Sequence, residues 1–247
     1  MKASKKQIAG EGAKDRRPLP PLPTLRLCVP IVEANPARAR SHYLRAARKG
    51  LWAEVRLDYL AKPELKRLFR TLPGPVIATN RPPAEGGRWL GSEADRRALL
   101  EEALTYGVHA LDVEFATEAA WRREIFTRRG KTRLILSWHD FSGTPEDAQL
   151  EEIFTAMLAE DADILKLVTH AAAPADNLRL LALIPRALAA GKQIIAFCMG
   201  PLGKWSRVAM VFLGGFLTFA PFNPQQASAP GQITVAEFRR LWRMLRK

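Results

Sequence analysis

Eight short apolar runs recur along the chain, and their spacing constrains the fold more than any other feature. Each run is rich in β-branched residues and is bounded by turn residues, which is typical of buried strands. Successive runs start 23 to 34 residues apart, close to the length of about 30 residues that one strand–helix–strand unit occupies. The runs cover residues 25–32, 51–58, 75–79, 109–115, 133–139, 163–169, 193–199 and 216–220.

The segments between the runs carry helix signals. Helix starts are indicated by a capping residue followed by proline or by an acid three positions later, at Asn35–Pro36, Ser92 with Asp95, and Thr144–Pro145 with Asp147. Helix ends are indicated by Gly50, Gly107, Gly130 and Gly191. The pattern predicts a first helix over 36–49 and a last helix over 234–246, whose apolar face includes Leu245.

Eight such units in roughly 220 residues indicate a (β/α)8 TIM barrel, which we place at residues 24–247 as a single catalytic domain. An open doubly wound sheet is the alternative. It would usually have fewer strands and a glycine-rich phosphate loop after the first strand. The first run is instead followed by VEANPARA, which lacks the G-x-G-x-x-G pattern.

The net charge of +13 is concentrated at the two ends of the chain. Residues 1–23 hold six basic and two acidic side chains and end in PLPPLP, which predicts a disordered leader outside the barrel. Residues 234–247 hold five basic side chains and one acidic side chain. A solvated tail and a solvated last helix explain these charges most simply, and nucleic-acid binding is the less favoured alternative.

Composition argues against several classes of protein. The most apolar stretch, residues 208–222, is 15 residues long, whereas a helix needs about 20 apolar residues to span a bilayer. The first 17 residues lack the apolar core of a secretory signal. The two cysteines, Cys28 and Cys198, exclude a disulfide-rich scaffold and a Cys₄ or Cys₂His₂ zinc finger. We therefore expect a cytoplasmic protein with no membrane partner.

Polar side chains gather where the predicted strands end. The carboxyl-terminal ends of the strands carry the active site in a TIM barrel, and core packing does not explain polar residues there. The candidates, in strand order, are Glu54, Arg56, Asp58, Thr79, Arg81, Glu85, Asp112, Glu114, His139, Lys166, Ser206, Arg207, Ser228 and Gln232.

Lys166 stands inside the apolar strand ILKLV. Burial disfavours its charged form, and a neutral amine attacks a carbonyl group to form an imine. The alternative is a buried ion pair with Glu114 or Asp112, and the strand context leaves both interpretations open. His139 ends the neighbouring strand and is a candidate proton-transfer group, although a lone histidine is more often structural. The adjacency of the two strands favours a joint catalytic role.

Three arginines, Arg56, Arg81 and Arg207, indicate an anionic, oxygen-rich substrate. Acidic neighbours such as Glu54 and Asp58 could pair with them, and we expect the acids to orient the arginines that hold the ligand. The four histidines suggest no metal site, because His139 and His170 lie on adjacent strands but lack a third ligand.

Five segments in register resemble type I 3-dehydroquinate dehydratase over nearly the whole body from Leu25 onward. They are 54–58 (EVRLD), 79–81 with 85–87 (TNR and EGG), 137–141 (SWHDF), Lys166, and 228–232 (SAPGQ). The resemblance implies a (β/α)8 barrel, usually a homodimer. It also implies a hydro-lyase of the shikimate pathway that converts 3-dehydroquinate to 3-dehydroshikimate without metal or coenzyme.

The resemblance also implies roles for individual residues. Lys166 would form the imine with the C3 ketone, His139 would move the proton from C2 to the leaving C1 hydroxyl, and Glu85 would orient His139. Arg207, Ser228 and Gln232 would bind the substrate carboxylate; Glu54, Arg56 and Arg81 would bind the ring hydroxyls. Met199 and Phe219 would wall the apolar side of the ring, and residues 200–206 would form part of a lid.

Some positions depart from the pattern of this family. His170 follows Lys166 by four residues and could share its face, and Pro30 stands where some members place a hydroxyl. Neither change removes a catalytic group. Two other functions remain open: another imine-forming, class I aldolase-like barrel lyase, which would share Lys166, and a non-catalytic barrel that binds nucleic acid.

Overall fold

A computed structural model describes residues 24–246, so the leader predicted at residues 1–23 lies outside the described part of the chain. Eight strands alternate with helices, and all recorded strand pairs are parallel. The strands are β1 (Leu27–Ile31), β2 (Trp52–Arg56), β3 (Val76–Thr79), β4 (Ala110–Glu114), β5 (Arg133–Asp140), β6 (Ile164–His170), β7 (Gln193–Met199) and β8 (Thr218–Phe219). Each lies within or overlaps one of the eight predicted runs.

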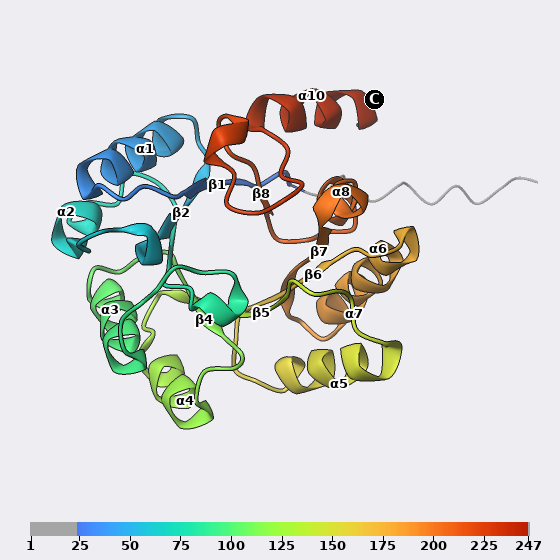
Figure 1. Ribbon diagram of the computed structural model, residues 1–247, viewed down its shortest axis with the longest axis horizontal. Helices are drawn as coiled ribbons and strands as arrows, with labels where there is room; N and C mark the ends of the chain where they lie inside the picture. The colour runs from blue at the N-terminus through green and yellow to red at the C-terminus, as the bar shows by residue number, and fades with distance from the viewer. Residues whose placement is uncertain (1–23, 247) are drawn as a thin grey trace, which may run out of the picture.

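The helices form a ring around the strands (Figure 1). They are α1 (Pro36–Arg48), α2 (Leu65–Phe69), α3 (Glu93–Thr105), α4 (Ala119–Arg128), α5 (Asp147–Leu158), α6 (Pro174–Leu181), α7 (Leu183–Ala189), α8 (Gly200–Gly203), α9 (Ser206–Phe212) and α10 (Val235–Leu245). Short 3₁₀ turns lie at η1 (Leu57–Tyr59), η2 (Pro83–Glu85) and η3 (Pro224–Gln226).

The strands pair in the order β7-β6-β5-β4-β3-β2-β1-β8. Between β7 and the start of β8, the backbone N–H of Phe216 donates to the carbonyl of Ile194 at 2.7 Å. This bond draws the two edge strands of the sheet together into a nearly closed barrel. The predicted (β/α)8 fold is therefore confirmed.

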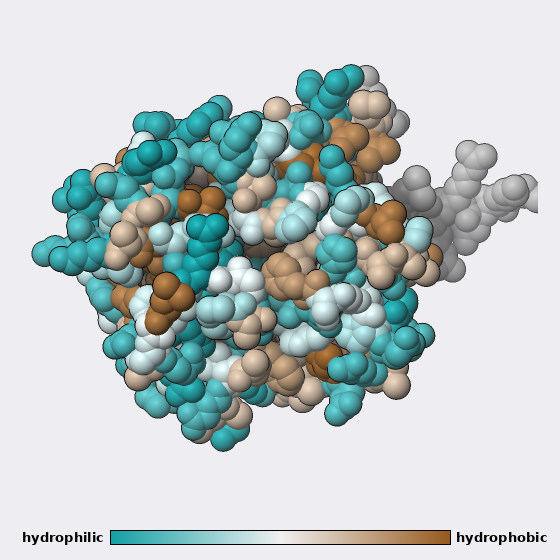
Figure 2. All heavy atoms as spheres, viewed as in Figure 1, coloured by the Kyte–Doolittle hydropathy of each residue, from teal (hydrophilic) through white to brown (hydrophobic). Residues whose placement is uncertain are grey.

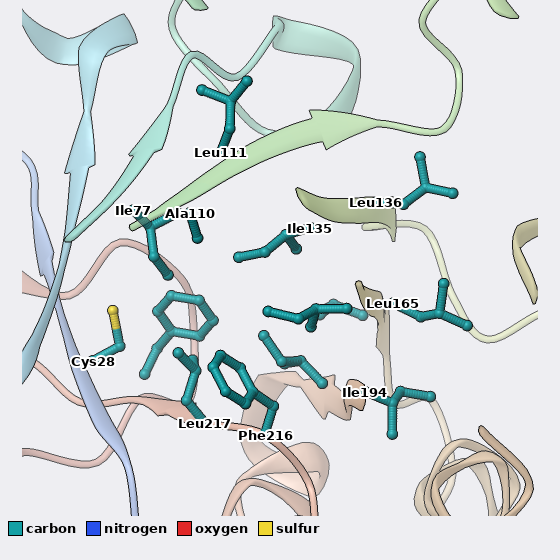
Figure 3. Close-up of a cluster of buried hydrophobic side chains, with 14 of the residues drawn as sticks. Cys28, Ile77, Ala110, Leu111, Ile135, Leu136, Leu165, Ile194, Phe216 and Leu217 are labelled. Atoms are coloured by element: carbon teal, nitrogen blue, oxygen red, sulfur yellow. The ribbon is translucent and has the colours of Figure 1, made fainter. Parts of the chain in front are cut away.

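Side chains alternate between the barrel interior and the helix layer along each strand. Figure 3 shows Ile77, Ala110 and Ile135 pointing into the barrel, whereas Leu136 and Leu165 point away from it, toward the helices. Because both faces are covered, the strands read as nearly continuous apolar sequence. The inward positions that follow Ala110 and Ile135 toward the carboxyl ends are polar, and there the core gives way to a site.

Side-chain capping explains the starts of α1, α3 and α10. Asn35 accepts from the backbone N–H of Ala37 at 2.8 Å, and Ser92 accepts from that of Asp95 at 3.1 Å, as predicted. The start predicted at Thr144 is wrong, because α5 begins at Asp147. The Thr144 hydroxyl instead bonds the Thr169 hydroxyl at 2.7 Å, which ties the loop to β6.

The last helix also departs from its prediction at one end. Leu245 was placed on the buried face, yet it is 59% exposed. It borders an apolar groove between α8–α9 and α10 that is also lined by Trp205, Phe212 and Leu241. Figure 2 shows a largely hydrophilic surface on this side of the molecule, with apolar residues gathered beside α10.

Candidate active site

A pocket opens at the carboxyl-terminal ends of the strands. Every residue to which the family resemblance gives a catalytic or substrate-binding role lines it, on segments that are far apart in the chain, whereas the strand-end candidates Asp58, Thr79, Asp112, Glu114 and Ser206 do not. The lining residues with such a role are Glu54, Arg56, Arg81, Glu85, His139, Lys166, Met199, Arg207, Phe219, Ser228 and Gln232. The lining also includes Gly86, Phe141, Val168, Phe197 and Ala229.

Lys166 reaches the floor of this pocket from the middle of β6. Its Nζ lies 2.8 Å from Oδ2 of Asp112 and 3.5 Å from Oε1 of Glu54, and it stands 4.7 Å from the centre of the Phe219 ring. Lys166 as a whole is 4% exposed. The buried ion pair that the strand context left open is therefore present, and its nearest acid is Asp112. Because Lys166 also borders the pocket, the ion pair leaves it within reach of a ligand.

His139 and Glu85 form a second pair beside the lysine. Nδ1 of His139 lies 2.8 Å from Oε2 of Glu85, and the two side chains are 9% and 7% exposed. Phe141 stacks on the imidazole with ring planes 24° apart. Since Glu85 occupies Nδ1, Nε2 is the ring nitrogen available to a ligand.

Burial determines the charge state of this pair. It raises the pKa of Glu85 to about 8, and burial together with the positive charge of Arg81 lowers the pKa of His139 well below its ordinary value. Both groups are therefore neutral at pH 7, and they share one hydrogen bond. When Nδ1–H donates to Glu85, the neutral imidazole has its lone pair on Nε2 and can accept a proton there, as a general base requires.

The two glycines after Glu85 explain how it reaches this position. Gly86 has φ +75° in the left-handed region, which ends the 3₁₀ turn η2. A Cβ at Gly87 would overlap the carbonyl oxygen of Arg81. The EGG motif is thus required by a tight return of the chain over Arg81.

Arg81 is surrounded by acids. Its guanidinium lies 2.7 Å from Asp112 Oδ1, 2.7 Å from Glu114 Oε1 and 3.6 Å from Glu85 Oε2, and it donates to Ser137 Oγ at 2.6 Å. Burial and these acids act in opposite directions, and the acids prevail, so the pKa of Arg81 is raised. Most of its donors are already engaged. Its predicted contact with ring hydroxyls stays a prediction.

Sequence reasoning missed Arg96. This side chain comes from α3, is 1% exposed, and donates to Glu114 Oε2 at 2.5 Å and to the carbonyl of Asn80 at 3.0 Å. It also pairs with Glu93, three residues earlier in the helix, at 2.7 Å. In the sequence that pair looks like an ordinary surface i,i+3 pair, so no local signal indicated a buried role.

Arg56 is oriented by an acid, as expected, and that acid is Asp58. The two side chains make a bidentate contact with distances of 2.8 and 2.7 Å. Asp58 also accepts from the backbone N–H of Arg88 at 2.9 Å, which ties the segment after the EGG motif to η1, the turn that follows β2. Glu54 instead accepts from Thr79 at 3.1 Å and faces Lys166.

Arg207 occupies the other side of the pocket and has no acidic partner among the described residues. It is 1% exposed, and Nη2 donates to the carbonyl of Pro230 at 2.9 Å. Its Nε and Nη1 are buried without a hydrogen-bond partner within residues 24–246. The guanidinium lies 4.3 Å from the centre of the Phe197 ring. Burial lowers the pKa of Arg207 to about 9, so an anion entering the pocket would restore favourable surroundings for its charge.

The loop after β8 supplies neutral polar groups next to Arg207. The backbone N–H of Ser228 donates to Gln232 Oε1 at 3.0 Å, and Gln232 Nε2 donates to the Ser228 hydroxyl at 3.1 Å. Gly231 has φ +79°, and a Cβ there would lie 2.7 Å from the carbonyl oxygen of Gly200. The SAPGQ segment therefore closes directly onto the end of β7.

Two further expectations near the pocket concern residues 200–206 and His170. Residues 200–206, expected as a loop, form the short helix α8, a turn and the start of α9, and Ser206 accepts from the backbone N–H of Cys198 at 3.0 Å, which ties the segment to β7. Its part in a lid stays a prediction. His170 is not among the residues that line the pocket. Its ring packs against Gly200, which leaves no room there for a side chain.

Within residues 24–246, no group of three or more His, Cys, Asp or Glu side chains is arranged to hold a metal ion. Over the same residues, no helix has the length and apolar character needed to cross a membrane. The expected absence of a metal stays a prediction.

Comparison with known proteins gives a consistent family. The model of the family described as Type I 3-dehydroquinase matches residues 27–247. The 3-dehydroquinate dehydratase of Desulfotalea psychrophila is 38% identical over 216 residues, which cover 87% of this chain and 95% of that protein. The 3-dehydroquinate dehydratase of Methanosarcina barkeri is 36% identical over 204 residues, which cover 78% of this chain and 84% of that protein.

Solved structures agree with the sequence relatives. The 3-dehydroquinate dehydratase of Geobacillus kaustophilus superposes with a TM-score of 0.81 and 27% identity, covering 90% of this chain and 91% of that one. The type I enzyme of Clostridium difficile, crystallised with covalently modified comenic acid, superposes with a TM-score of 0.77 and 26% identity, covering 91% and 92%. The chain belongs to the type I 3-dehydroquinase family.

Proposed function

We propose that this pocket dehydrates 3-dehydroquinate to 3-dehydroshikimate through an imine on Lys166, as a hydro-lyase of the shikimate pathway that leads to aromatic amino acids. Family membership and the names of the relatives support the reaction. The observation that carries the mechanism is one pocket holding a buried lysine, a neutral imidazole and an arginine with no acidic partner within residues 24–246. The first supplies a nucleophile, the second a base and the third an anion site.

Arg207 determines how the substrate enters. Its free Nε and Nη1 would donate to the substrate carboxylate, and the hydroxyl of Ser228 and the amide of Gln232 lie on the same side. Glu54, Arg56 and Arg81 line the opposite side and would bind ring hydroxyls. Met199 and Phe219 form apolar walls for the ring.

The carbonyl at C3 then faces Lys166. The amine adds to that carbon, the carbonyl oxygen leaves as water, and the nitrogen keeps the positive charge as an iminium. The iminium withdraws electrons from C2, so Nε2 of His139 can take the C2 proton. The electron pair left at C2 forms the new double bond as the C1 hydroxyl departs with the proton from His139. Hydrolysis of the iminium releases the product and restores the lysine.

In this mechanism the iminium is the electron sink, so we propose that the reaction needs no metal or coenzyme. The covalently modified ligand in the Clostridium difficile relative fits a reactive group in that pocket. We also propose that the enzyme acts in the cytoplasm. We further propose that it is a homodimer, and light scattering of the purified chain would test this oligomeric state.

Borohydride trapping tests the imine. Reduction of the enzyme with substrate present should inactivate it and add one ligand mass at Lys166, because the imine becomes a stable amine. The exposed Lys131 serves as the control, since its variant Lys131→Met should be trapped like the unmodified enzyme. Label on another lysine, or an active enzyme that is never trapped, would contradict the assignment. EDTA should leave turnover unchanged, and a loss restored by a divalent ion would overturn the metal-free mechanism.

The aldolase-like alternative is separated from the dehydratase by the product. Dehydration gives a conjugated enone, whose ultraviolet absorbance rises as 3-dehydroquinate is consumed. Carbon–carbon cleavage gives no such chromophore.

A further inference from the structure

Asp112 touches the nitrogen on which the proposed chemistry takes place. Its Oδ2 lies 2.8 Å from Nζ of Lys166, closer than any other acid. The carboxylate is fully buried on β4, at an inward position opposite the lysine. The sequence suggested Asp112 only as an ion-pair partner of Lys166, and the mechanism above gives it no task.

The other oxygen of Asp112 is fixed by two donors. Oδ1 lies 2.7 Å from Nη2 of Arg81 and accepts from the Ser137 hydroxyl at 2.6 Å. The carboxylate is therefore held on one side by protein groups and presents its remaining oxygen to the lysine. The positive charges of Arg81 and Lys166 hold the pKa of Asp112 well below its ordinary value, so it is ionised throughout the working pH range.

Charge accounting along the reaction shows why this carboxylate matters. A protonated lysine and a ketone combine to give an iminium and one water, so the nitrogen carries one positive charge before and after the step. The iminium withdraws electrons from C2 while it stays protonated. A negative charge in direct contact favours that protonated form, and the effect is strong where water is excluded.

We propose that Asp112 is the counter-ion of the Lys166 iminium and keeps the imine protonated while the C1 hydroxyl leaves. This role rests on the proposed dehydratase function. Asp112 is then a catalytic residue, because it contacts a reacting atom.

The other charged or titratable groups around Lys166 are less suited to this role. Glu54 is 3.5 Å from Nζ and also accepts from Thr79, and Glu85 is neutral at pH 7. Glu114 is engaged by Arg81 and Arg96. The remaining groups near the nitrogen are a cation, a neutral imidazole and a buried thiol, namely Arg81 on the β3 side, His139 on β5 and Cys28 on β1.

The decisive variant is Asp112→Asn, which keeps the shape and removes the charge. Turnover alone would mix its effect with the titration of Glu85 near pH 8, so the readout is the rate at which cyanoborohydride reduces the enzyme–ligand adduct. That reagent reduces the protonated imine. We expect the alkaline midpoint of the reduction rate to fall by about 1–3 pH units in the variant, the usual effect of losing an adjacent opposite charge.

Glu114→Gln is the matched control. Glu114 and Asp112 both hold Arg81, but Glu114 does not contact Lys166. The Glu114→Gln enzyme should therefore keep the alkaline midpoint of the unmodified enzyme, even where its turnover drops through Arg81. An equal shift in both variants would show that Asp112 acts through Arg81, which overturns the counter-ion role.

A measurement on the unmodified enzyme covers the case in which Asp112→Asn does not fold. Its adduct should be reduced at a constant rate from about pH 7 to about pH 9, because the counter-ion holds the proton. A rate that falls across this range overturns the proposal. A second outcome separates this proposal from the proposed function. If the enzyme turns over 3-dehydroquinate and is labelled at Lys166, but the alkaline midpoint is the same in Asp112→Asn and the unmodified enzyme, the counter-ion role is overturned and the dehydratase function stands. Absence of turnover in the unmodified enzyme overturns the dehydratase itself.

Discussion

On the wall of the pocket formed by β2 to β6, each cationic side chain faces a carboxylate, whereas Arg207 on the opposite wall faces none among the described residues. Arg56 pairs with Asp58, Arg81 with Asp112 and Glu114, and Lys166 with Asp112. Arg207 has a carbonyl and the face of an aromatic ring as its neighbours. The two walls are equally buried, so burial does not cause the difference.

The presence of paired acids on one wall and their absence around Arg207 within residues 24–246 correspond to two tasks, catalysis and anion binding. Groups that perform chemistry must have a fixed position and charge before the substrate arrives, and neighbouring acids provide both. A group that binds an anion gains most when no protein acid competes for its donors. The unpaired state of Arg207 therefore destabilises the empty protein and favours occupation by a carboxylate.

The largest expected effect tests the wall formed by β2 to β6, which we call the chemical wall because it holds Lys166 and His139. Lys166→Met should lower turnover by at least about 10⁴-fold, because it removes the nucleophile. Substrate should still bind, since Arg207 is untouched, and calorimetry with the variant measures this. Loss of binding together with turnover would show that the two walls are not separate in function.

The proton-transfer pair comes next. His139→Ala should lower turnover by about 10²–10⁴-fold, the usual contribution of a positioned acid or base, while slow borohydride trapping at Lys166 persists. His170→Ala is the control, because His170 packs against Gly200 and is not part of the pocket lining. A larger loss in His170→Ala than in His139→Ala would mean that the wrong histidine has been assigned.

Replacing each of the two arginines, Arg81 and Arg207, by leucine compares the two walls directly. Arg81→Leu should lower stability by about 3–5 kcal/mol, because it leaves buried acids without their cation. Arg207→Leu should raise stability by about 1 kcal/mol or more, since it removes a buried charge that no acid of the described residues neutralises, while KM rises steeply. Thermal melting and steady-state kinetics of both variants measure this. The same sign of stability change in both would break the comparison between the walls.

Much of this site could be predicted from the sequence because parallel strands in a barrel end on the same face. Knowing the strand or the loop after a strand to which each residue belongs was enough to bring His139, Lys166 and Arg207 together without knowing any distance. The same logic could not choose the partner of Lys166. Asp112 and Glu114 both point inward from β4, and which of them reaches the lysine depends on the relative heights of β4 and β6 in the barrel.

Side chains that enter from the helix layer escaped prediction for a different reason. Arg96 lies on α3 in a sequence that gives it a surface-like partner, Glu93, and its buried contact with Glu114 depends on how α3 packs on the barrel. Thr144 was assigned as a cap because its spacing to Asp147 fits one, but its hydroxyl is taken by Thr169. In both cases a tertiary contact overrides a plausible local one.

The smallest expected effect concerns Glu85, which lies on the chemical wall but is neutral at pH 7. Burial raises its pKa from the ordinary value of 4.5 to about 8, so between these two pH values the folded state binds more protons than the unfolded state. Stability contributed by this group is therefore lost as pH rises across that window. Glu85→Gln cannot ionise and escapes the loss. The melting temperature of Glu85→Gln minus that of the unmodified enzyme should increase by at least about 2 °C from about pH 5 to about pH 9. At this chain length, a change of 1 kcal/mol in stability shifts the melting temperature by about 2–4 °C. The exposed Glu102→Gln should show no such trend. If the difference in melting temperature between Glu85→Gln and the unmodified enzyme stays constant across this pH range, Glu85 is ionised in the folded protein. The chemical wall then carries one more fixed negative charge, which lies next to His139.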